Sequence, residues 1–265
     1  MPVTATATLC ATSRVSAASF LCELDAGRGF PDARPGQFVH VRTPAGVTLR
    51  RPFSVAGVTG RGRFELLIRE RGCGTRSLAA LEAGAPISVV GPLGNAFTLP
   101  EPQRIAVLVG GGIGVAGLRL LAGRIAGDGG RALLLVGATT GSELLHHVLP
   151  GETEDGRIRL RVSTDDGSQG LRGTVCSLLE RELDGLPVSG VRIYCCGPRA
   201  MLSSGARVAI AHEFPCEVLM EEVMACGVGA CRGCVVRTRH GYRAACSDGP
   251  VFDASEVVFE EESVA

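Results

Sequence analysis

The chain has 265 residues, 45% hydrophobic and 20% charged, so it can bury a large core and is long enough for two or three domains. Its 27 basic residues are all arginine and balance 27 acidic ones, which argues against nucleic-acid binding; the absence of lysine excludes a lysine Schiff base and a P-loop lysine. Its 11 cysteines are odd in number and dispersed, which fits a reduced, cytoplasmic protein better than a disulfide framework.

Residues 1–100 read as short strands separated by glycine or proline. Alternating or β-branched stretches predict strands at 3–9, 20–24, 37–42, 63–69 and 86–90, and a further strand opens near Arg51. Strands at this spacing indicate an antiparallel barrel or sandwich. The longest uncharged run, 83–100, contains three prolines and would break as a membrane helix, and no basic n-region precedes Arg14, so we expect no membrane association.

Residues 101–212 switch to longer, alternating units. Apolar runs predict buried strands at 104–109 and 132–137, further strands are predicted at 158–162 and 190–196, and helical patterns cover 118–126, 175–182 and 200–211. Strands that alternate with helices imply a parallel α/β sheet of the nucleotide-binding kind.

Residues 213–265 show little strand or helix signal and are too few to form an independent core without a covalent or metal staple. This segment is acidic, and the run Glu260 to Glu262 predicts an exposed tail. Its four clustered cysteines are the obvious source of a staple.

Those cysteines have the spacing C-x4-C-x2-C-x11-C, at Cys226, Cys231, Cys234 and Cys246. The x4, x2 start is the plant-type [2Fe–2S] arrangement, in which each iron takes two thiolates and nearby glycines bring backbone N–H groups close to the cluster. A zinc site would more often show two short C-x2–4-C pairs, and it remains an alternative, with plain buried thiols a third.

A glycine-rich turn follows the first buried strand of the α/β region. Gly112, Gly114 and Gly117 satisfy G-x-G-x-x-G between a strand and a helix, where free N–H groups attract a pyrophosphate. The next strand ends without an acid for a ribose hydroxyl, so the alternative is a glycine turn that packs helix on strand.

Two further loops reach the same edge of the predicted sheet. Cys196-Gly197-Pro198 follows the fourth strand and 163–167 follows the third, and ligands of open α/β sheets bind at that edge. The small side chain of Cys196 would leave room for a nicotinamide. The alternative is that Gly-Pro only turns the chain.

The barrel region carries its own candidate site. Arg51 could hold a phosphate bidentately, and Ser54 could hydrogen-bond a ring nitrogen. Residues 67–69 lead to Gly72-Cys73-Gly74-Thr75, which predicts a tight turn with free amides. Taken alone, these would be solvated surface groups.

Together these stretches resemble the ferredoxin–NADP⁺ reductase superfamily. Residues 51–54 are similar to its flavin-binding R-P-x-S motif, residues 110–114 to its glycine turn, and residues 196–198 to its C-G-P motif. Within it, the order of segments and the stretch 224–234, followed by Cys246-Ser247-Asp248-Gly249-Pro250, resemble the electron-transfer subunits of class 1B dihydroorotate dehydrogenase.

The resemblance implies three parts: an FAD-binding antiparallel β-barrel at 1–100, an NAD-binding α/β domain at 101–212 and a [2Fe–2S] module at 213–265. The four cysteines would be the cluster ligands. The FAD contacts would be Arg51, Pro52, Phe53, Ser54, Leu67, Ile68, Arg69, Gly74 and Thr75. The NAD contacts would be Gly110, Gly111, Gly112, Ile113, Gly114, Cys196, Gly197 and Pro198. Ser54 and Cys196 would be the catalytic pair.

The implied activity is electron transfer in pyrimidine (UMP) biosynthesis. An FMN-bearing catalytic subunit, in a heterotetramer of two of each subunit, would oxidise dihydroorotate, and electrons would pass through [2Fe–2S] and FAD to NAD⁺. The absence of an arginine pair after the second buried strand favours NAD over NADP.

Two other classes of protein remain open. One is a subunit of an NAD(P)H:ferredoxin oxidoreductase or another FAD/[2Fe–2S] reductase. The small subunit of NADH-dependent ferredoxin:NADP⁺ oxidoreductase has a similar layout but typically an aspartate where Cys226 stands. The other class is a non-catalytic, zinc-stapled binding protein.

Overall fold

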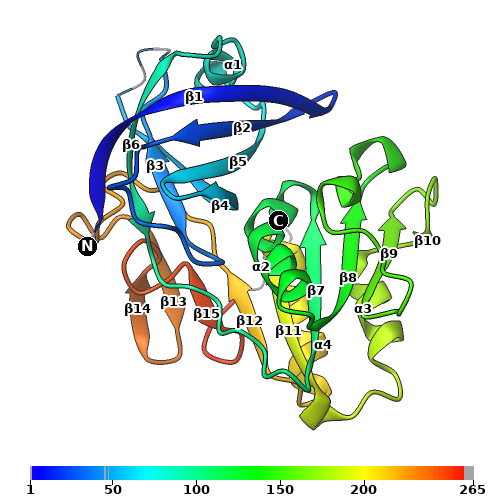
Figure 1. Cartoon of the computed structure of the whole chain (residues 1–265). Helices are drawn as coiled ribbons and strands as arrows, with labels where there is room; N and C mark the ends of the chain where they lie inside the picture. The colour runs from blue at the N-terminus through cyan, green and yellow to red at the C-terminus, as the bar shows by residue number, and fades with distance from the viewer. Residues whose placement is uncertain (1, 45, 47, 260–265) are drawn as a thin grey trace.

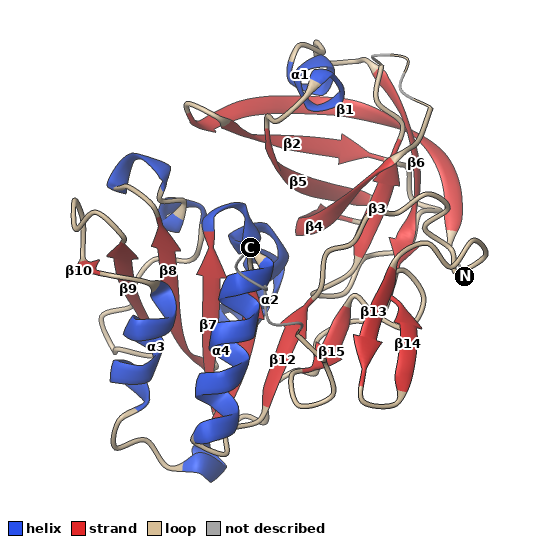
Figure 2. Ribbon diagram, turned by 180° about the vertical axis from the view of Figure 1, so that it is seen from behind, coloured by secondary structure: helices blue, strands red, loops and turns tan. Residues whose placement is uncertain are grey.

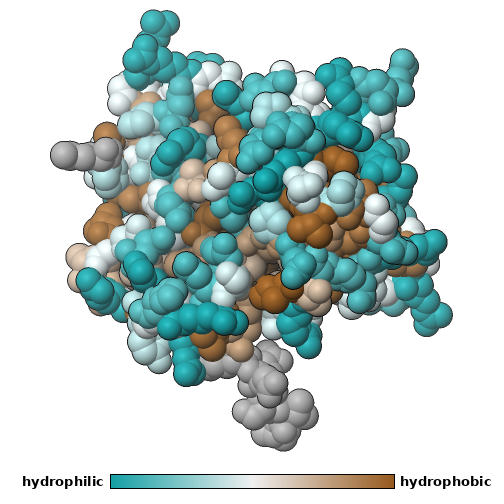
Figure 3. All heavy atoms as spheres, turned by 90° about the horizontal axis from the view of Figure 1, so that it is seen from below, coloured by the Kyte–Doolittle hydropathy of each residue, from teal (hydrophilic) through white to brown (hydrophobic). Residues whose placement is uncertain are grey.

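The structure is a computed structural model that describes residues 2–44, 46 and 48–259. A barrel and an α/β domain lie side by side, with a small hairpin module below the barrel (Figure 1). The predicted tail at Glu260 to Glu262 lies outside the described residues. Within them, every helix is too short or too polar to cross a membrane. The face seen from below carries hydrophobic patches among hydrophilic residues (Figure 3).

The first region is a closed antiparallel barrel, which confirms the predicted architecture. Alternation along the first strand explains its inward face, since Ala7 and Leu9 are fully buried while Thr6 and Thr8 are exposed. The barrel order is β1-β2-β5-β4-β3-β6. The strands are β1 (Val3–Ser16), β2 (Ser19–Asp25), β3 (Phe38–Val41), β4 (Arg51–Gly60), β5 (Arg63–Arg69) and β6 (Pro86–Leu93), and helix α1 (Cys73–Ala79) lies between β5 and β6.

The second region is a seven-stranded sheet in the order β10-β9-β8-β7-β11-β12-β15, parallel except for its last strand. Its strands are β7 (Ile105–Gly111), β8 (Arg131–Ala138), β9 (Ile158–Thr164), β10 (Leu171–Arg172), β11 (Val191–Cys196), β12 (Cys216–Leu219) and β15 (Val251–Asp253). Its helices are α2 (Val115–Gly127), α3 (Val175–Leu183) and α4 (Arg199–Ala211), with short 3-10 turns η1 (Gly112–Gly114), η2 (Gly141–Glu143), η3 (His146–Val148) and η4 (Val188–Gly190).

Helices cover both faces of this sheet. Helix α2 lies on one face and α3 and α4 on the other (Figures 1 and 2). Along β7, Ala106 and Leu108 join the core under α2, whereas Val107 and Val109 join the core under α3 and α4. The unbroken apolar run predicted for this strand is therefore buried on both sides.

The third segment holds more strand than its sequence pattern predicted. β12 pairs with β11 and β15 pairs with β12, so the sheet continues past the predicted boundary at residue 212. The remaining strands, β13 (Val235–Thr238) and β14 (Gly241–Ala244), form a hairpin. None of the four exceeds four residues, which is too short to show a period.

The order of strands locates the ligand crevice of the sheet. The chain runs outward from β7 through β8 to β9 and then returns to β11 on the other side of β7. The topological switch point therefore lies between β7 and β11, whose ends pair Gly110 with Cys196. The predicted glycine turn and the Cys-Gly-Pro loop thus meet at this point.

A largely buried arginine forms one of the links between the barrel and the sheet domain. Arg119 of α2 donates to Glu65 of β5 at 2.5 Å, to the carbonyl of Ala56 at 3.1 Å and to the carbonyl of Val148 at 2.8 Å. Its side chain is 23% exposed and that of Glu65 is 16% exposed. Removing the cation would leave a largely buried carboxylate unpaired.

We expect Arg119→Met to lower the free energy of unfolding by about 2–4 kcal/mol, somewhat less than for a fully buried pair because of the residual exposure. Chemical denaturation of the FAD-loaded protein measures this. The matched control is Arg124→Met on the same helix, because the exposed Arg124–Asp128 pair should contribute less than about 0.5 kcal/mol. Equal losses in the two variants would contradict a joining role for Arg119.

Candidate functional site

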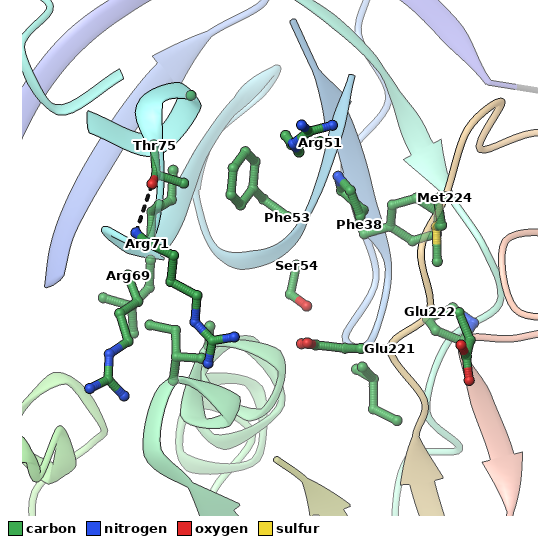
Figure 4. A pocket seen from close by; sticks show the side chains of 18 of the residues that line it. Phe38, Arg51, Phe53, Ser54, Arg69, Arg71, Thr75, Glu221, Glu222 and Met224 are labelled. Atoms are coloured by element: carbon green, nitrogen blue, oxygen red, sulfur yellow. Dashed lines mark hydrogen bonds between the residues drawn. The ribbon is translucent and has the colours of Figure 1, made fainter. Parts of the chain in front are cut away.

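A cavity of about 480 Å³ opens where the barrel faces the sheet (Figure 4). We call it the first cavity. Its walls come from β4, β5, the start of α1 and the segment 219–224. It brings together all nine residues for which the resemblance implies FAD contacts, namely Arg51, Pro52, Phe53, Ser54, Leu67, Ile68, Arg69, Gly74 and Thr75.

The charge of the first cavity suits a flavin dinucleotide. Arg51 and Arg71 line it, and neither forms an ion pair within the described residues. The Arg51 guanidinium is held at 3.2 Å by the carbonyl of Leu49. Two unpaired cations can neutralise a pyrophosphate, and the apolar side chains of Phe53 and Leu67 can pack against a planar ring. The residues present therefore fit FAD.

The predicted tight turn at residues 72–75 is instead the start of helix α1. The Thr75 hydroxyl accepts hydrogen bonds from the backbone N–H of Arg71 at 2.9 Å and of Gly72 at 3.2 Å. The Thr75 hydroxyl oxygen therefore stabilises the loop that precedes helix α1. Gly74 has little room for a side chain, because an added Cβ would lie 3.1 Å from the Thr43 hydroxyl.

Opposite Ser54, the first cavity carries a carboxylate that sequence reasoning missed. Figure 4 shows the Ser54 hydroxyl and the Glu221 carboxylate pointing toward one another across the space. Glu221 is exposed to solvent through the mouth of the cavity, but the cavity walls surround its carboxylate. Desolvation by these walls raises the pKa of Glu221, and the nearby charge of Arg71 opposes that rise. The only sequence signal was its position, five residues before Cys226.

A second cavity, of about 340 Å³, lies at the carboxyl edge of the sheet. Gly111, Gly112 and Pro198 of the predicted nicotinamide site line it, while Ile113 lines the first cavity. Arg69 stands in the wall of both. The two cavities therefore flank the glycine turn and share a boundary.

The other predicted nicotinamide residues, Gly110, Gly114, Cys196 and Gly197, lie behind these walls. A Cβ added to Gly114 would lie 2.2 Å from the carbonyl oxygen of Cys196. The Cys196 side chain is 1% exposed and faces α2, and burial raises the pKa of its thiol. These residues hold the turn against β11.

The four motif cysteines come together. The thiol of Cys226 interacts with that of Cys231, and the thiol of Cys246 interacts with those of Cys234 and Cys226. Within the described residues, no three His, Cys, Asp or Glu side chains surround a single metal-ion position. Four neighbouring thiols that share no single metal-ion position fit a cluster of two irons, each bound by two sulfurs.

Backbone N–H groups point at these sulfurs. Val228 and Cys231 donate to the Cys226 sulfur at 3.5 and 3.4 Å, and Gly229 donates to the Cys246 sulfur at 3.1 Å. Burial acts to raise the pKa of Cys226, but these donors outweigh it and lower the pKa to about 6. Donors of this kind stabilise thiolate ligands, so the residues fit an iron–sulfur cluster.

The cysteine loop sits directly on the barrel. Gly227 has φ +73°, and a Cβ there would lie 2.6 Å from Nδ1 of His40 in β3. His40 is fully buried, and burial lowers its pKa, so the imidazole beneath the loop is neutral. Only glycine satisfies both the backbone angle and the close approach at position 227.

Cys73 offers a test of the first cavity, because its thiol is exposed and lines the cavity wall. We expect FAD at about 100 times its Kd to slow alkylation of Cys73 by up to about 100-fold, since only about 1% of sites would be free. Mass spectrometry after iodoacetamide treatment measures this. Unchanged labelling would contradict flavin binding here.

Cys176 is the internal control for that experiment. Burial raises its pKa to about 12, so at pH 8 only about one thiol in 10⁴ is ionised. Its labelling should be slow with or without FAD and should rise about tenfold per pH unit below pH 12, because the thiolate is the reactive form.

Two family models match the chain at the places where these sites lie. The oxidoreductase FAD-binding domain matches residues 8–98, which form the barrel. The iron–sulfur cluster binding domain of dihydroorotate dehydrogenase B matches residues 221–258, which hold the four cysteines. The cysteine module is therefore an iron–sulfur domain, and the zinc alternative is excluded.

Proteins that align with most of this chain point to the same family as the iron–sulfur domain model. The "Dihydroorotate dehydrogenase B (NAD(+)), electron transfer subunit" of Bacillus mycoides (strain KBAB4) is 37% identical over 84% of this chain and 86% of its own. The subunit of that name from Desulforamulus reducens is 37% identical over 86% of this chain and 88% of its own.

Solved structures show the same architecture. A structure of NADH-dependent reduced ferredoxin-NADP oxidoreductase superposes with a TM-score of 0.82 at 27% identity, covering 96% of this chain and 90% of that one. A ferredoxin reductase of carbazole 1,9a-dioxygenase gives 0.69 at 20% identity, covering 81% and 67%, and shares the fold. With its FAD-binding barrel, parallel-sheet domain and iron–sulfur module, the chain belongs to the family of dihydroorotate dehydrogenase B electron transfer subunits and is an oxidoreductase subunit.

Proposed function

We propose that this chain carries electrons from an FMN-bearing, dihydroorotate-oxidising partner through a [2Fe–2S] cluster and FAD to NAD⁺, in cytoplasmic pyrimidine (UMP) biosynthesis. One observation carries the proposal: a single segment borders both redox sites. Glu221, Glu222 and Met224 line the first cavity, and Cys226 follows two residues later. Flavin chemistry joins one-electron exchange with iron to two-electron hydride exchange with nicotinamide.

The residues of the chain supply binding and placement. Arg51 and Arg71 would neutralise the flavin pyrophosphate, and the apolar wall around Phe53 would help to keep water from the ring. Ser54 can hydrogen-bond the ring, and the Glu221 carboxylate faces Ser54 across the cavity. Cys196 supports the glycine turn from behind, so its part in catalysis is indirect.

The surface around the cysteine loop suits a protein partner. Within the described residues, eight large hydrophobic side chains are exposed, and Val223, Val228, Val235 and Tyr242 are four of them. Exposed apolar groups gathered in one small module mark an interaction surface. The partner would be the catalytic subunit, in a heterotetramer of two of each.

Co-expression with a candidate catalytic subunit tests the proposal. The purified complex should contain FMN, FAD, iron and sulfide, and it should reduce NAD⁺ with dihydroorotate. A complex that lacks FMN, or that holds all cofactors but does not reduce NAD⁺ with dihydroorotate, would refute the dihydroorotate assignment. This chain alone should still oxidise NADH with ferricyanide.

A second candidate is a subunit that serves a ferredoxin, as in NADH-dependent ferredoxin-NADP oxidoreductase, and the structural match at a TM-score of 0.82 favours it. The cysteine at position 226, where that family typically has aspartate, favours dihydroorotate dehydrogenase instead. The complex separates the two, because the second candidate predicts reduction by ferredoxin and not by dihydroorotate.

A further inference from the structure

His40 is a fully buried polar side chain in strand β3. Alternation along this strand turns Val39 and Val41 into the core of the barrel and leaves Phe38 and His40 on the opposite side. Phe38 lines the first cavity, and its ring stands edge to face with that of His40, with the ring centroids 6.3 Å apart. His40 therefore lies one side chain away from the proposed flavin site.

The other neighbour of His40 is the start of the cysteine loop. Its ring nitrogen Nδ1 would lie 2.6 Å from a Cβ at Gly227, and the backbone of Met224 and Cys226 lies within reach of the ring. Met224 lines the first cavity, and Cys226 is the first proposed cluster ligand. His40 thus supports, from the barrel side, the segment that borders both redox sites.

Packing alone does not explain a histidine at this position. Among the described residues, neither ring nitrogen of His40 has a partner at full hydrogen-bond geometry. An imidazole carries at least one N–H donor in either charge state. Burial of an unpartnered donor destabilises the folded protein, whereas an aliphatic side chain would fill the space without that cost. A buried donor of this kind therefore points to a group that it serves when the site is loaded.

We propose that His40 is a positioning residue, whose ring N–H holds the backbone of residues 224–227 when the cluster is bound and so seats the cluster against the flavin barrel. This inference rests on the proposed function, in which Cys226 is a cluster ligand and electrons pass between the cluster and FAD. The support is rigid, because β3 pairs with β4 on one side and with β6 on the other.

Two substitutions separate hydrogen bonding from packing. His40→Asn keeps an amide N–H near the place of Nδ1 but is smaller, whereas His40→Leu fills most of the space and has no donor. The full chain, loaded with FAD and its cluster, is mixed with excess iron chelator, and the loss of the cluster's visible absorbance is followed. His40→Leu should lose its cluster about 10–100-fold faster than the unsubstituted protein, and His40→Asn at most about threefold faster. The FAD content of each variant reports that the barrel is folded.

The loop offers an independent test that leaves the barrel unchanged. Gly227→Ala would put its Cβ against His40 and should release the cluster about as fast as His40→Leu. Gly229→Ala is the matched control and should release it several-fold more slowly than Gly227→Ala. Gly229 has φ +81°, against +73° at Gly227, but a Cβ there meets only the side chain of Ser247, at 3.0 Å. The double variant Gly227→Ala, His40→Leu should stay within about twofold of the faster single variant, because both changes remove the same contact.

His146→Leu is the control for replacing a histidine. His146 also has a buried ring nitrogen without a partner among the described residues, but it lies in η3 and lines neither cavity. This variant should hold its cluster as long as the unsubstituted protein does.

Equal cluster lifetimes in His40→Leu and the unsubstituted protein would overturn the inference. A His40→Asn protein that loses its cluster as fast as His40→Leu would also overturn it, because packing would then account for the whole effect. If neither His40 variant retains FAD, the two glycine variants decide, and equal lifetimes for Gly227→Ala and Gly229→Ala overturn the inference. An unsubstituted protein that holds no cluster, or whose cluster NADH does not reduce, would instead refute the proposed function.

Discussion

Cys226→Ser should abolish dihydroorotate-driven NAD⁺ reduction while NADH oxidation with ferricyanide continues. Mutation of a residue that hydrogen-bonds a metal ligand lowers metal affinity or activity by about 10–100-fold. Replacement of the ligand itself should therefore lower the dihydroorotate-driven activity by at least about 100-fold. The flavin should stay, because Cys226 is not among the residues that line the first cavity. Iron and sulfide content, the visible spectrum and the two activities measure this.

Serine is the right replacement because the variant should still fold. The serine oxygen can accept hydrogen bonds from the backbone N–H groups of Val228 and Cys231, which now donate to the Cys226 sulfur. Cys10→Ser is the matched control. Cys10 lies in β1, outside the cysteine motif, so this variant should retain iron and both activities. A Cys226→Ser protein with full iron content and unchanged electron flow from dihydroorotate would remove Cys226 from the ligand set.

Gly114→Ala should have the second large effect, a loss of NADH oxidation by about 100-fold. The added Cβ would lie 2.2 Å from the Cys196 carbonyl oxygen and 2.6 Å from the Gly197 Cα, and backbone atoms cannot rotate away as a side chain does. The glycine turn must move off β11, and a displacement of about 1 Å can cost about 10²-fold in rate. The free energy of unfolding should fall by about 1–3 kcal/mol, because the added methyl group overpacks the turn.

Gly123→Ala is the control on the same helix. A Cβ there meets nothing within 4 Å, and alanine should stabilise the helix by about 0.5–1 kcal/mol with activity unchanged. FAD content should be normal in both variants. Of the glycine turn and helix α2, only Ile113 and Ala116 line the first cavity, and neither is substituted. NADH oxidation by Gly114→Ala at the normal rate would contradict the close packing of the turn.

Most of the fold was predictable because its signals are local. Period-two alternation indicated the strands of the barrel, and continuous apolar runs indicated β7 and β8, which are buried on both faces. The short strands β12 and β15 were not predictable, because three or four residues carry no period. They form through pairing with strands already in place, and this pairing extends the sheet beyond residue 212.

The site was predictable where a motif is contiguous and less so where contacts are distant in sequence. Residues 51–54 and 67–69 line one cavity, and the FAD contacts that the motifs imply for them stay a prediction. Arg71 and Glu221 enter the same cavity from positions that carried no motif. Cys196 lies at the predicted edge, but its side chain turns toward α2, because the surroundings of β11 decide which way it points.

The sequence by itself determined the chemistry that depends on spacing: four cysteines at cluster spacing, a glycine turn and an arginine–proline–serine stretch, with no lysine to bind phosphate. Only the tertiary structure decided which groups face one another. It set Glu221 opposite Ser54 and paired Arg69 with Glu143. The physical reason is that spacing is a property of the covalent chain, whereas pairing and burial depend on contacts between residues far apart in the sequence.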